Sequence, residues 1–379
     1  MIQTLKHQKI VNSYIEKLIL PSRPEAPLWN RESIIYGKPA RWNYIDGCMI
    51  KALLMLYYCC GDNRLLDFSV GFTDFYVTEN GDIPTLNPLD YNLDNINGCK
   101  NLLTLYKLTG MKKYMAAAEK TVNTQLAGQP RLRCGSFTHK AIYPSQIWLD
   151  GAYMVLPFMT EYASMTGDTD MTEDVLMQLQ NIRRIMLDSE TGLYYHGYNE
   201  SGEQQWADPA TGLSGEFWLR AMGWLCAGLA DICELSDENG ELFRFSRDML
   251  TELLDSLSSC ITDGDMLLQL PARSELSGNY PETSGTLLTA YSALKACRLG
   301  IGSEKTKTDG MRLLAAVFSK YISYENEIPV LGNICLMAGL GGSQQRSGTA
   351  EYYLSEKIVS NDAKGIAPLL MACSEICRI

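Results

Sequence analysis

The stretch "MTGDTDMTEDVLMQL", Met165 to Leu179, places a glycine between two segments with helical apolar spacing. Gly167 suits the end of the first helix, because glycine tolerates the left-handed backbone conformation that often ends a helix. Asp168 then offers a capping carboxylate to the helix that follows, where the backbone N–H groups favour negative charge. The stretch therefore predicts two helices joined by a tight turn.

The same helix–glycine–helix arrangement recurs along the chain. It is found in "CCGDNRLLDFSVGF" (59–72), in "LTGMKKYMAAAEK" (108–120) and in "RLGIGSEKTKTDGMRLL" (298–314). Where the hairpins can be followed, they are spaced by about 50 to 57 residues. Because one such hairpin cannot bury its apolar face alone, neighbouring hairpins must stack on each other.

Apolar periodicity predicts about twelve helices in all. They fall near 3–18, 45–60, 63–77, 95–108, 112–126, 146–165, 170–187, 215–235, 240–259, 280–299, 304–321 and 362–377. Six pairs favour an all-α fold, a closed (α/α)6 barrel formed as a single domain by residues 1–379, over an open helical solenoid. Several helices are apolar on nearly every side, as the inner helices of a ring must be. Short strands are expected only at 192–198 and 265–270.

Composition excludes several classes of function. The net charge of −11 argues against broad binding to nucleic acids or anionic membranes. The twelve cysteines form no CxxC pair, which favours reduced, buried thiols over a zinc or redox site. No run of about twenty uncharged apolar residues predicts a membrane span, and the N-terminal stretch does not resemble a signal peptide. We therefore expect a cytoplasmic protein without a metal or another cofactor.

Asp150 is the only charged side chain in an apolar run from Ile147 to Met159. Burying an unpaired carboxylate costs several kcal/mol, so this residue needs an explanation. It either lies in the first turn of a helix that opens near Gln146, where the helix dipole favours an acid, or it is a general acid whose pKa is raised by apolar surroundings. The neighbouring Trp148 and Tyr153 resemble the wall of a sugar-binding site.

The chain has three histidines, and two of them flank aromatic loops. His7 lies in a polar N-terminal stretch. His139 precedes Asp150 by eleven residues, and His196 lies in "GLYYHGY". This clustering favours ligand contact over a purely structural role. Neither an HxxxH nor an HxxE spacing is present, so we expect no metal site.

Two further charged residues each leave two interpretations open. Asp94 precedes an amphipathic helix and is either its N-cap or a second carboxylate at the same end of the barrel. In "EFWLRAMGW", Phe217, Arg220 and Trp224 share one face of a helix. An arginine on an apolar helix requires an anion or an aromatic partner. Arg220 is therefore either a buried ion-pair partner of another helix or a clamp on a substrate carboxylate.

Five stretches of the chain resemble the unsaturated rhamnogalacturonyl hydrolases of glycoside hydrolase family 105, in the order that the family has them. They are "DNINGCKNLLTLYKLTG" (94–110), "FTHKAIYPSQIWLDGAYMVLPF" (137–158), "GLYYHGYNESGEQQWADPATGLSGEFWLRAMGW" (192–224), "PETSGTLLTAYSALKACRLG" (281–300) and "GTAEYYLSE" (348–356). The most specific parts are "WLDGAYM" and "WADPATGLSGEFWLRAMGW".

The resemblance implies an (α/α)6 barrel and an unusual reaction, the hydration of a double bond in an unsaturated sugar acid. An acid protonates C4, water adds at C5, and the resulting hemiketal opens and releases the rest of the sugar. Matched motif by motif, the resemblance implies that Asp150 is catalytic. It also implies that the substrate is bound by Asp94, His139, His196, Trp218, Arg220, Trp224 and Tyr44.

The expected substrate is a small anionic disaccharide, unsaturated galacturonyl-rhamnose from pectin. One alternative keeps the chemistry and changes the substrate to unsaturated glucuronyl units from ulvan or glycosaminoglycans, as in the neighbouring family 88. Another alternative is a non-enzymatic helical-repeat protein that binds a partner or a sugar. The aromatic side chains clustered around an acid argue against this second alternative.

Overall fold

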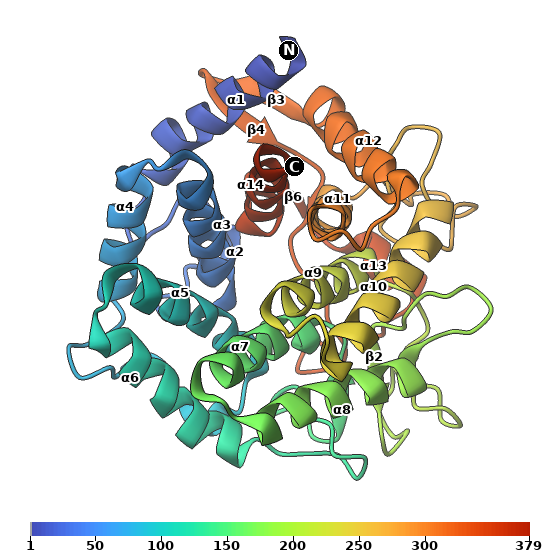
Figure 1. The fold of residues 1–379 in the computed structure, drawn as a ribbon. Helices are drawn as coiled ribbons and strands as arrows, with labels where there is room; N and C mark the ends of the chain where they lie inside the picture. The colour runs from blue at the N-terminus through green and yellow to red at the C-terminus, as the bar shows by residue number, and fades with distance from the viewer. Residues whose placement is uncertain (1) are drawn as a thin grey trace.

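The computed structural model describes the backbone of residues 2–379 and the side chains from His7 onward. Six helices form an inner ring (Figure 1). They are α3 (Tyr44–Cys60), α5 (Cys99–Thr109), α7 (Asp150–Thr166), α9 (Leu219–Leu235), α11 (Thr283–Arg298) and α14 (Ala363–Arg378). Each packs against the next, and α14 packs against α3, so the ring is closed. The open solenoid is therefore wrong.

A second set of helices lies outside this ring (Figure 1). It consists of α1 (Ile2–Tyr14), α4 (Asn63–Asp74), α6 (Lys112–Thr121), α8 (Thr169–Met186), α10 (Glu241–Ser259) and α12 (Glu304–Lys320). The two layers make the predicted (α/α)6 barrel, in which the first helix of the chain lies outside the last. Every one of the twelve predicted helices has a counterpart.

The glycine turns follow the prediction from the sequence. Gly61, Gly110, Gly167 and Gly300 have φ values of 66°, 71°, 75° and 73°, in the left-handed region. After Gly167, the Asp168 side chain accepts a hydrogen bond from the main-chain N–H of Met171 and caps α8. These local signals end one helix and start the next at defined positions.

Burial separates the two layers of helices. In the inner helix α9, fifteen consecutive residues from Leu219 to Cys233 are buried. In the outer helix α10, the buried residues recur at helical spacing and the others face solvent. The inner ring thus contributes most of the core, and polar residues inside it require specific partners.

The remaining elements are short. The helices are α2 (Arg31–Tyr36), α13 (Ala350–Ser355), the π-helical turns η1 (Ile15–Ile19) and η4 (Val122–Leu126), and the 3₁₀ turns η2 (Pro88–Asp90) and η3 (Leu93–Gly98). The strands are β1 (Gln146–Trp148), β2 (Gly197–Asn199), β3 (Ile322–Glu325), β4 (Ile328–Leu331), β5 (Ile334–Cys335) and β6 (Ile358–Val359). They form three antiparallel pairs, β1–β2, β3–β4 and β5–β6.

Several predicted boundaries were wrong. The helix expected from 146 starts at Asp150, because Gln146–Trp148 forms β1 instead. The helix expected from 215 starts at Leu219, and the one expected from 95 begins as the 3₁₀ turn η3. The strand expected at 192–198 is limited to Gly197–Asn199. The one expected at 265–270 is only an isolated bridge between Leu268 and Pro281, since no neighbouring segment extends it.

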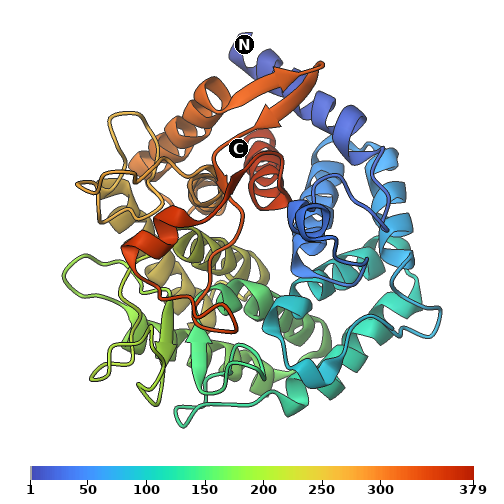
Figure 2. The same cartoon turned by 180° about the vertical axis from the view of Figure 1, so that it is seen from behind.

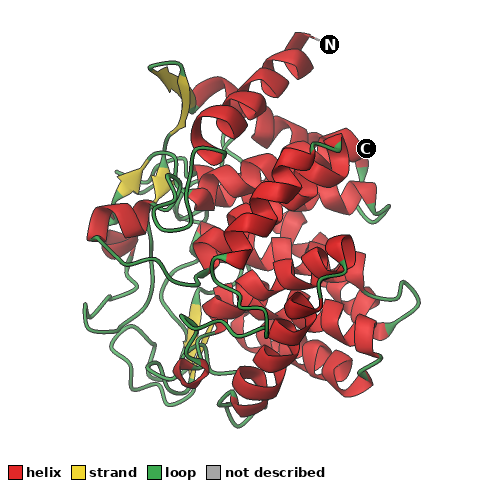
Figure 3. Cartoon of the chain, turned by 90° about the vertical axis from the view of Figure 1, so that its left-hand side faces the viewer, coloured by secondary structure: helices red, strands yellow, loops and turns green. Residues whose placement is uncertain are grey.

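The strands and long loops gather at one end of the barrel, where the inner helices begin (Figure 3). We call this end of the barrel the front end. It faces the viewer in Figure 2, where the segment that contains α13 crosses over the inner helices. The other end has short turns. Among residues 2–379, no helix combines the length and the apolar character needed to cross a bilayer.

Candidate active site

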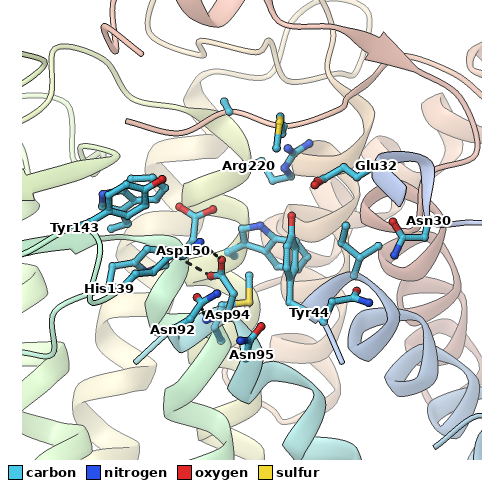
Figure 4. A pocket seen from close by; sticks show the side chains of 18 of the residues that line it. Asn30, Glu32, Tyr44, Asn92, Asp94, Asn95, His139, Tyr143, Asp150 and Arg220 are labelled. Carbon is cyan, nitrogen blue, oxygen red and sulfur yellow. Dashed lines mark hydrogen bonds and ion pairs between the residues drawn. The ribbon is translucent and has the colours of Figure 1, made fainter. Parts of the chain in front are cut away.

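A cavity of about 250 Å³ opens at the front end, between the loops that precede the inner helices (Figure 4). We call it the front cavity. Seven of the eight predicted site residues line it: Tyr44, Asp94, His139, Asp150, Trp218, Arg220 and Trp224. The eighth, His196, is fully buried directly beside Asp150. The structure therefore brings all eight together from segments that are far apart in the sequence.

Asp150 is the first residue of α7, as the helix-terminus interpretation predicted. The pairing of β1 with β2 brings His196 next to Asp150. The N–H of Leu149, one residue before Asp150, donates to the His196 carbonyl over 2.9 Å. His196 Nε2 then lies 3.1 Å from Asp150 Oδ2. No lysine or arginine among the described side chains forms an ion pair with Asp150. Its closest ionisable partner is an imidazole.

A tyrosine holds the other side of His196. Tyr353, in α13, is fully buried, and its hydroxyl lies 2.7 Å from His196 Nδ1. This is the only hydrogen bond of that hydroxyl within the described part of the chain. Because a buried hydroxyl needs an acceptor for its proton, we assign Tyr353 as the donor to Nδ1, which leaves Nε2 as the protonated nitrogen of the neutral imidazole. No motif in the sequence indicated this contact.

Asp94 is tightly paired. Lys140 Nζ lies 2.6 Å from Asp94 Oδ2, and His139 Nε2 lies 3.4 Å from Oδ1. Burial alone would raise the pKa of Asp94, but Lys140 and His139 outweigh it and hold the pKa below its ordinary value. Asp94 is not an N-cap, because Asn92 caps the turn η3. The N-cap interpretation was therefore wrong, and Lys140 is a site residue that the sequence did not indicate.

His139 is neutral near pH 7. Burial is the main cause that lowers its pKa to about 4, Lys140 lowers it further, and Asp94 only partly opposes the shift. The imidazole packs against the start of α7, where a Cβ on Gly151 would lie 3.1 Å from His139 Nδ1. Gly151 is thus needed for the approach of this side chain.

The aromatic wall differs from the prediction. The Trp148 ring lines the front cavity and stacks on those of His139 and Tyr143, at centroid distances of 4.7 and 4.8 Å. Tyr153 does not line the front cavity, because it lies behind Trp224, stacked on it at 4.6 Å. The interpretation was therefore wrong for Tyr153, whereas Trp148 lies in the wall of the front cavity as expected.

Arg220 has a buried acidic neighbour, as the ion-pair interpretation of this residue predicted. Its Nη1 donates to Ser284 Oγ over 3.1 Å and to the Cys335 carbonyl, and lies 3.9 Å from the Glu282 carboxylate. Its guanidinium also lies 4.6 Å from the centre of the Trp218 ring. These hydrogen bonds use Nη1, so Nη2 remains available where the side chain borders the cavity.

Cationic side chains outnumber carboxylates around the front cavity. The cations are Lys38, Arg41, Lys140, Arg220 and Arg346, and the carboxylates are Glu32, Asp94 and Asp150. Among the described side chains, Arg41 and Arg346 have no carboxylate partner. Arg346, from the glycine-rich segment after β5, donates to Tyr143 Oη over 3.0 Å. The balance of charge favours an anionic ligand although the protein as a whole is acidic.

Comparison with known proteins identifies the family to which a chain with this barrel and front cavity belongs. Residues 28–379 match the model of Glycosyl Hydrolase Family 88. The chain is also similar, at 32% identity and a TM-score of 0.87, to a family 105 glycoside hydrolase of C. acetobutylicum ATCC 824, over 98% of both chains. The chain therefore belongs to the family that this model describes, and its similarity to the solved structure groups it with the unsaturated glycoside hydrolases of family 105. The non-enzymatic alternative is wrong.

Two other relatives match parts of the chain. Protein Atu3128 of Agrobacterium fabrum is 38% identical over 229 residues, which are 59% of this chain and 97% of that protein. The unsaturated rhamnogalacturonyl hydrolase YesR of Bacillus subtilis is 26% identical over 215 residues, 52% of this chain and 60% of that protein. The expectation of family 105 is confirmed.

Proposed function

We propose that this glycoside hydrolase removes a 4,5-unsaturated galacturonyl residue from rhamnogalacturonan-derived disaccharides by hydrating the C4=C5 double bond. We further propose that residues 1–379 act as one catalytic domain. The name of the relative YesR supports the choice of substrate, and the excess of cations around the front cavity supports the choice of a sugar acid.

The observation that carries the proposal is the different environment of two acids in one cavity. Asp94 is kept ionised by Lys140. Asp150 has His196 as its ionisable neighbour and no cationic side chain to hold it as a carboxylate. Two acids in such unequal surroundings suit different roles. We assign the exchangeable proton to Asp150 and a fixed negative charge to Asp94.

In the proposed reaction the Asp150 carboxyl donates its proton to C4 of the sugar. The resulting carboxylate accepts a proton from the water that adds at C5, so Asp150 is regenerated and one water is consumed. The C5 hemiketal opens to a ketone, and the acetal carbon C1 becomes a hemiacetal that breaks down to an aldehyde and the free aglycone. One acid performs both proton transfers, unlike the two acids of most glycosidases.

The other predicted residues have proposed roles in binding. Tyr44, Trp218 and Trp224 offer aromatic surface to the sugar ring. The free Nη2 of Arg220 is placed to bind a sugar carboxylate or hydroxyl. Asp94 and the neutral His139 are placed to bind sugar hydroxyls, and His196 orients Asp150.

The test follows the ultraviolet absorbance of the conjugated C=C–COO⁻ group. Purified protein is mixed with unsaturated disaccharides from rhamnogalacturonan, ulvan and chondroitin. We expect the absorbance to disappear fastest with the rhamnogalacturonan product. Persistence of the chromophore with all three would refute the proposed reaction, and a faster loss with another disaccharide would refute the substrate alone.

A second candidate substrate is favoured by Arg41 and Arg346, the two cavity cations without a carboxylate partner. An aglycone that carries its own acidic group, as sulfated ulvan or glycosaminoglycan units do, would provide that partner. Arg346→Gln distinguishes the two substrates. It should raise the KM for a sulfated disaccharide about tenfold if this guanidinium binds the sulfate, and it should leave the KM for a neutral aglycone nearly unchanged.

We place the proposed reaction in the cytoplasm, as one step in the breakdown of imported pectin fragments. All twelve cysteines are unpaired, and five of them are buried. Unpaired thiols in this number are typical of a reducing compartment.

A further inference from the structure

A second cavity, of about 410 Å³, lies among the inner helices behind the front cavity. We call it the rear cavity. All six inner helices contribute to its wall, including Lys51 and Tyr58 of α3, Lys100 and Lys107 of α5, Glu161 of α7, Asp231 and Glu234 of α9, Lys295 of α11 and Arg378 of α14. None of the predicted site residues is among them.

Most charges in the rear cavity are compensated. Asp231 pairs with both Lys51 and Lys295, and its Oδ1 lies 2.8 Å from Lys295 Nζ. Lys107 Nζ lies 2.8 Å from the Glu161 carboxylate. Glu234 likewise pairs with Lys295 and Arg378. These pairs form a polar network in the middle of an otherwise apolar ring.

Lys100 is the exception. Its side chain is 95% buried, yet no carboxylate among the described residues lies within ion-pair distance of its Nζ. Burial lowers the pKa of Lys100 well below its ordinary value, and the positive charge of Lys51 lowers it further. A buried ammonium without a counter-charge is strongly disfavoured, so this position needs an explanation beyond packing.

Part of that explanation lies in α7. Pro157 has no N–H to donate to the carbonyl of Tyr153, four residues earlier in the helix. Lys100 Nζ donates to that carbonyl over 3.0 Å and also lies 3.4 Å from the centre of the Tyr153 ring. An ammonium group has three N–H donors. These contacts therefore leave N–H donor capacity on the wall of the cavity, and a bound anion would favour the charged form of Lys100.

Tyr153 also separates the two cavities. It is completely buried, and its ring stacks on Trp224, which lines the front cavity, while Lys100 of the rear cavity lies over the ring as well. The two groups cannot share one face of the ring, so they occupy opposite faces. A ligand in the rear cavity would thus not contact Asp150.

We propose that the rear cavity binds a small oxyanion, such as phosphate or a carboxylate, with Lys100 as its buried cationic partner. The anion would supply the counter-charge that Lys100 lacks and would accept its remaining N–H groups. Lys51, on the same wall, adds attraction. The site is separate from the front cavity and does not depend on the reaction proposed there.

The test measures the melting temperature of the protein in increasing inorganic phosphate, in increasing acetate, and in sodium chloride of equal ionic strength. We expect a saturable rise with an oxyanion beyond that with chloride. Stabilisation by phosphate alone identifies a phosphate site, and stabilisation by both identifies a general oxyanion site. In Lys100→Gln, which keeps an N–H donor and removes the charge, the apparent Kd should rise about tenfold or more.

Arg346→Gln is the control, because it removes one positive charge from the front cavity and leaves the rear cavity intact. It should keep the wild-type response to the oxyanion. An equal response in Lys100→Gln and the wild type, or a rise no larger than that with chloride, would overturn the proposal. If Lys100→Gln does not fold, Lys51→Gln takes its place and should weaken the response, and an unchanged Kd in that variant would also overturn the proposal.

Discussion

The front and rear cavities lie in the same barrel but are lined in different ways. The front cavity is lined by residues from loops and helix starts, and no lysine or arginine among the described side chains forms an ion pair with its acid Asp150. The rear cavity is lined by residues within helices, and no described carboxylate lies within ion-pair distance of Lys100, although the charge of Asp231 acts on it from farther away. Most other charges in the two cavities are paired, and the exceptions among the described side chains are Arg41 and Arg346 of the front cavity. We conclude from this comparison that a buried charged group without an ion-pair partner marks a candidate ligand-binding site. Cavity size does not separate such a site from a network of paired charges that stabilises the fold.

The largest effect should follow from removing the uncompensated acid. Asp150→Asn keeps the shape of the side chain and removes its proton transfer, so kcat should fall about a thousandfold. The loss of the substrate chromophore measures the rate. Asp208→Asn, in an exposed loop at the front end, is the matched control and should keep wild-type activity. Full activity of Asp150→Asn would exclude it as the proton donor.

A substitution in the network of paired charges of the rear cavity should change the stability of the protein and leave its activity unchanged. Asp231→Asn leaves Lys51 and Lys295 without their shared carboxylate, so we expect a loss of about 3–5 kcal/mol in the free energy of unfolding. Chemical denaturation measures this loss, and kcat well below the melting temperature should stay unchanged. An unchanged stability, or a kcat reduced as much as in Asp150→Asn, would contradict the assignment of catalysis to the front cavity and of stabilisation to the rear network.

His139 should make stability depend on pH. Its pKa is about 4 in the folded protein and about 6.5 when unfolded. The unfolded chain therefore takes up the proton first, and stability falls as the pH drops from about 6.5 to about 4, by about 3 kcal/mol in total. Denaturation of the wild type and of His139→Gln across this range measures the slope. The variant should have a flatter profile, and parallel profiles would contradict the assignment.

The smallest effect should come from Tyr353, whose hydroxyl contacts His196 and not Asp150 itself. Tyr353→Phe removes the hydroxyl that fixes the His196 tautomer, so kcat should fall about tenfold with little change in KM. The pH profile of kcat should also shift, because the proton on Nε2 is no longer fixed. Tyr352→Phe removes the adjacent hydroxyl, which accepts the Gly339 N–H, and should leave that profile in place.

The fold could be predicted because its signals are local. A glycine such as Gly110 or Gly167 ends one helix within a few residues, and the apolar periodicity on either side defines the hairpin. The starts of the inner helices at the front end were less predictable. Gln146–Trp148 is apolar enough for a helix, but it pairs with Gly197–Asn199, about fifty residues away. Nothing within either segment encodes that partner.

The candidate site was predicted as a set of residues but not as a network. The motifs around Asp150, His196 and Arg220 identified residues that the structure brings together. The contacts of Lys140 with Asp94 and of Tyr353 with His196 were not foreseen, because each depends on how separate loops meet. Tyr153 was misplaced for a similar reason, since its position one turn into α7 directs it behind Trp224 instead of toward the sugar.

The stacked pair of Tyr153 and Trp224 closes the inner end of the front cavity. Among the described residues this pair lies between the front and rear cavities, so the two do not join into one channel past Asp150. Under the proposed function, a terminal sugar would enter and both products would leave through the same mouth. The architecture thus suits exo-acting cleavage of short fragments, in which each turnover requires the product to depart before the next chain end can enter.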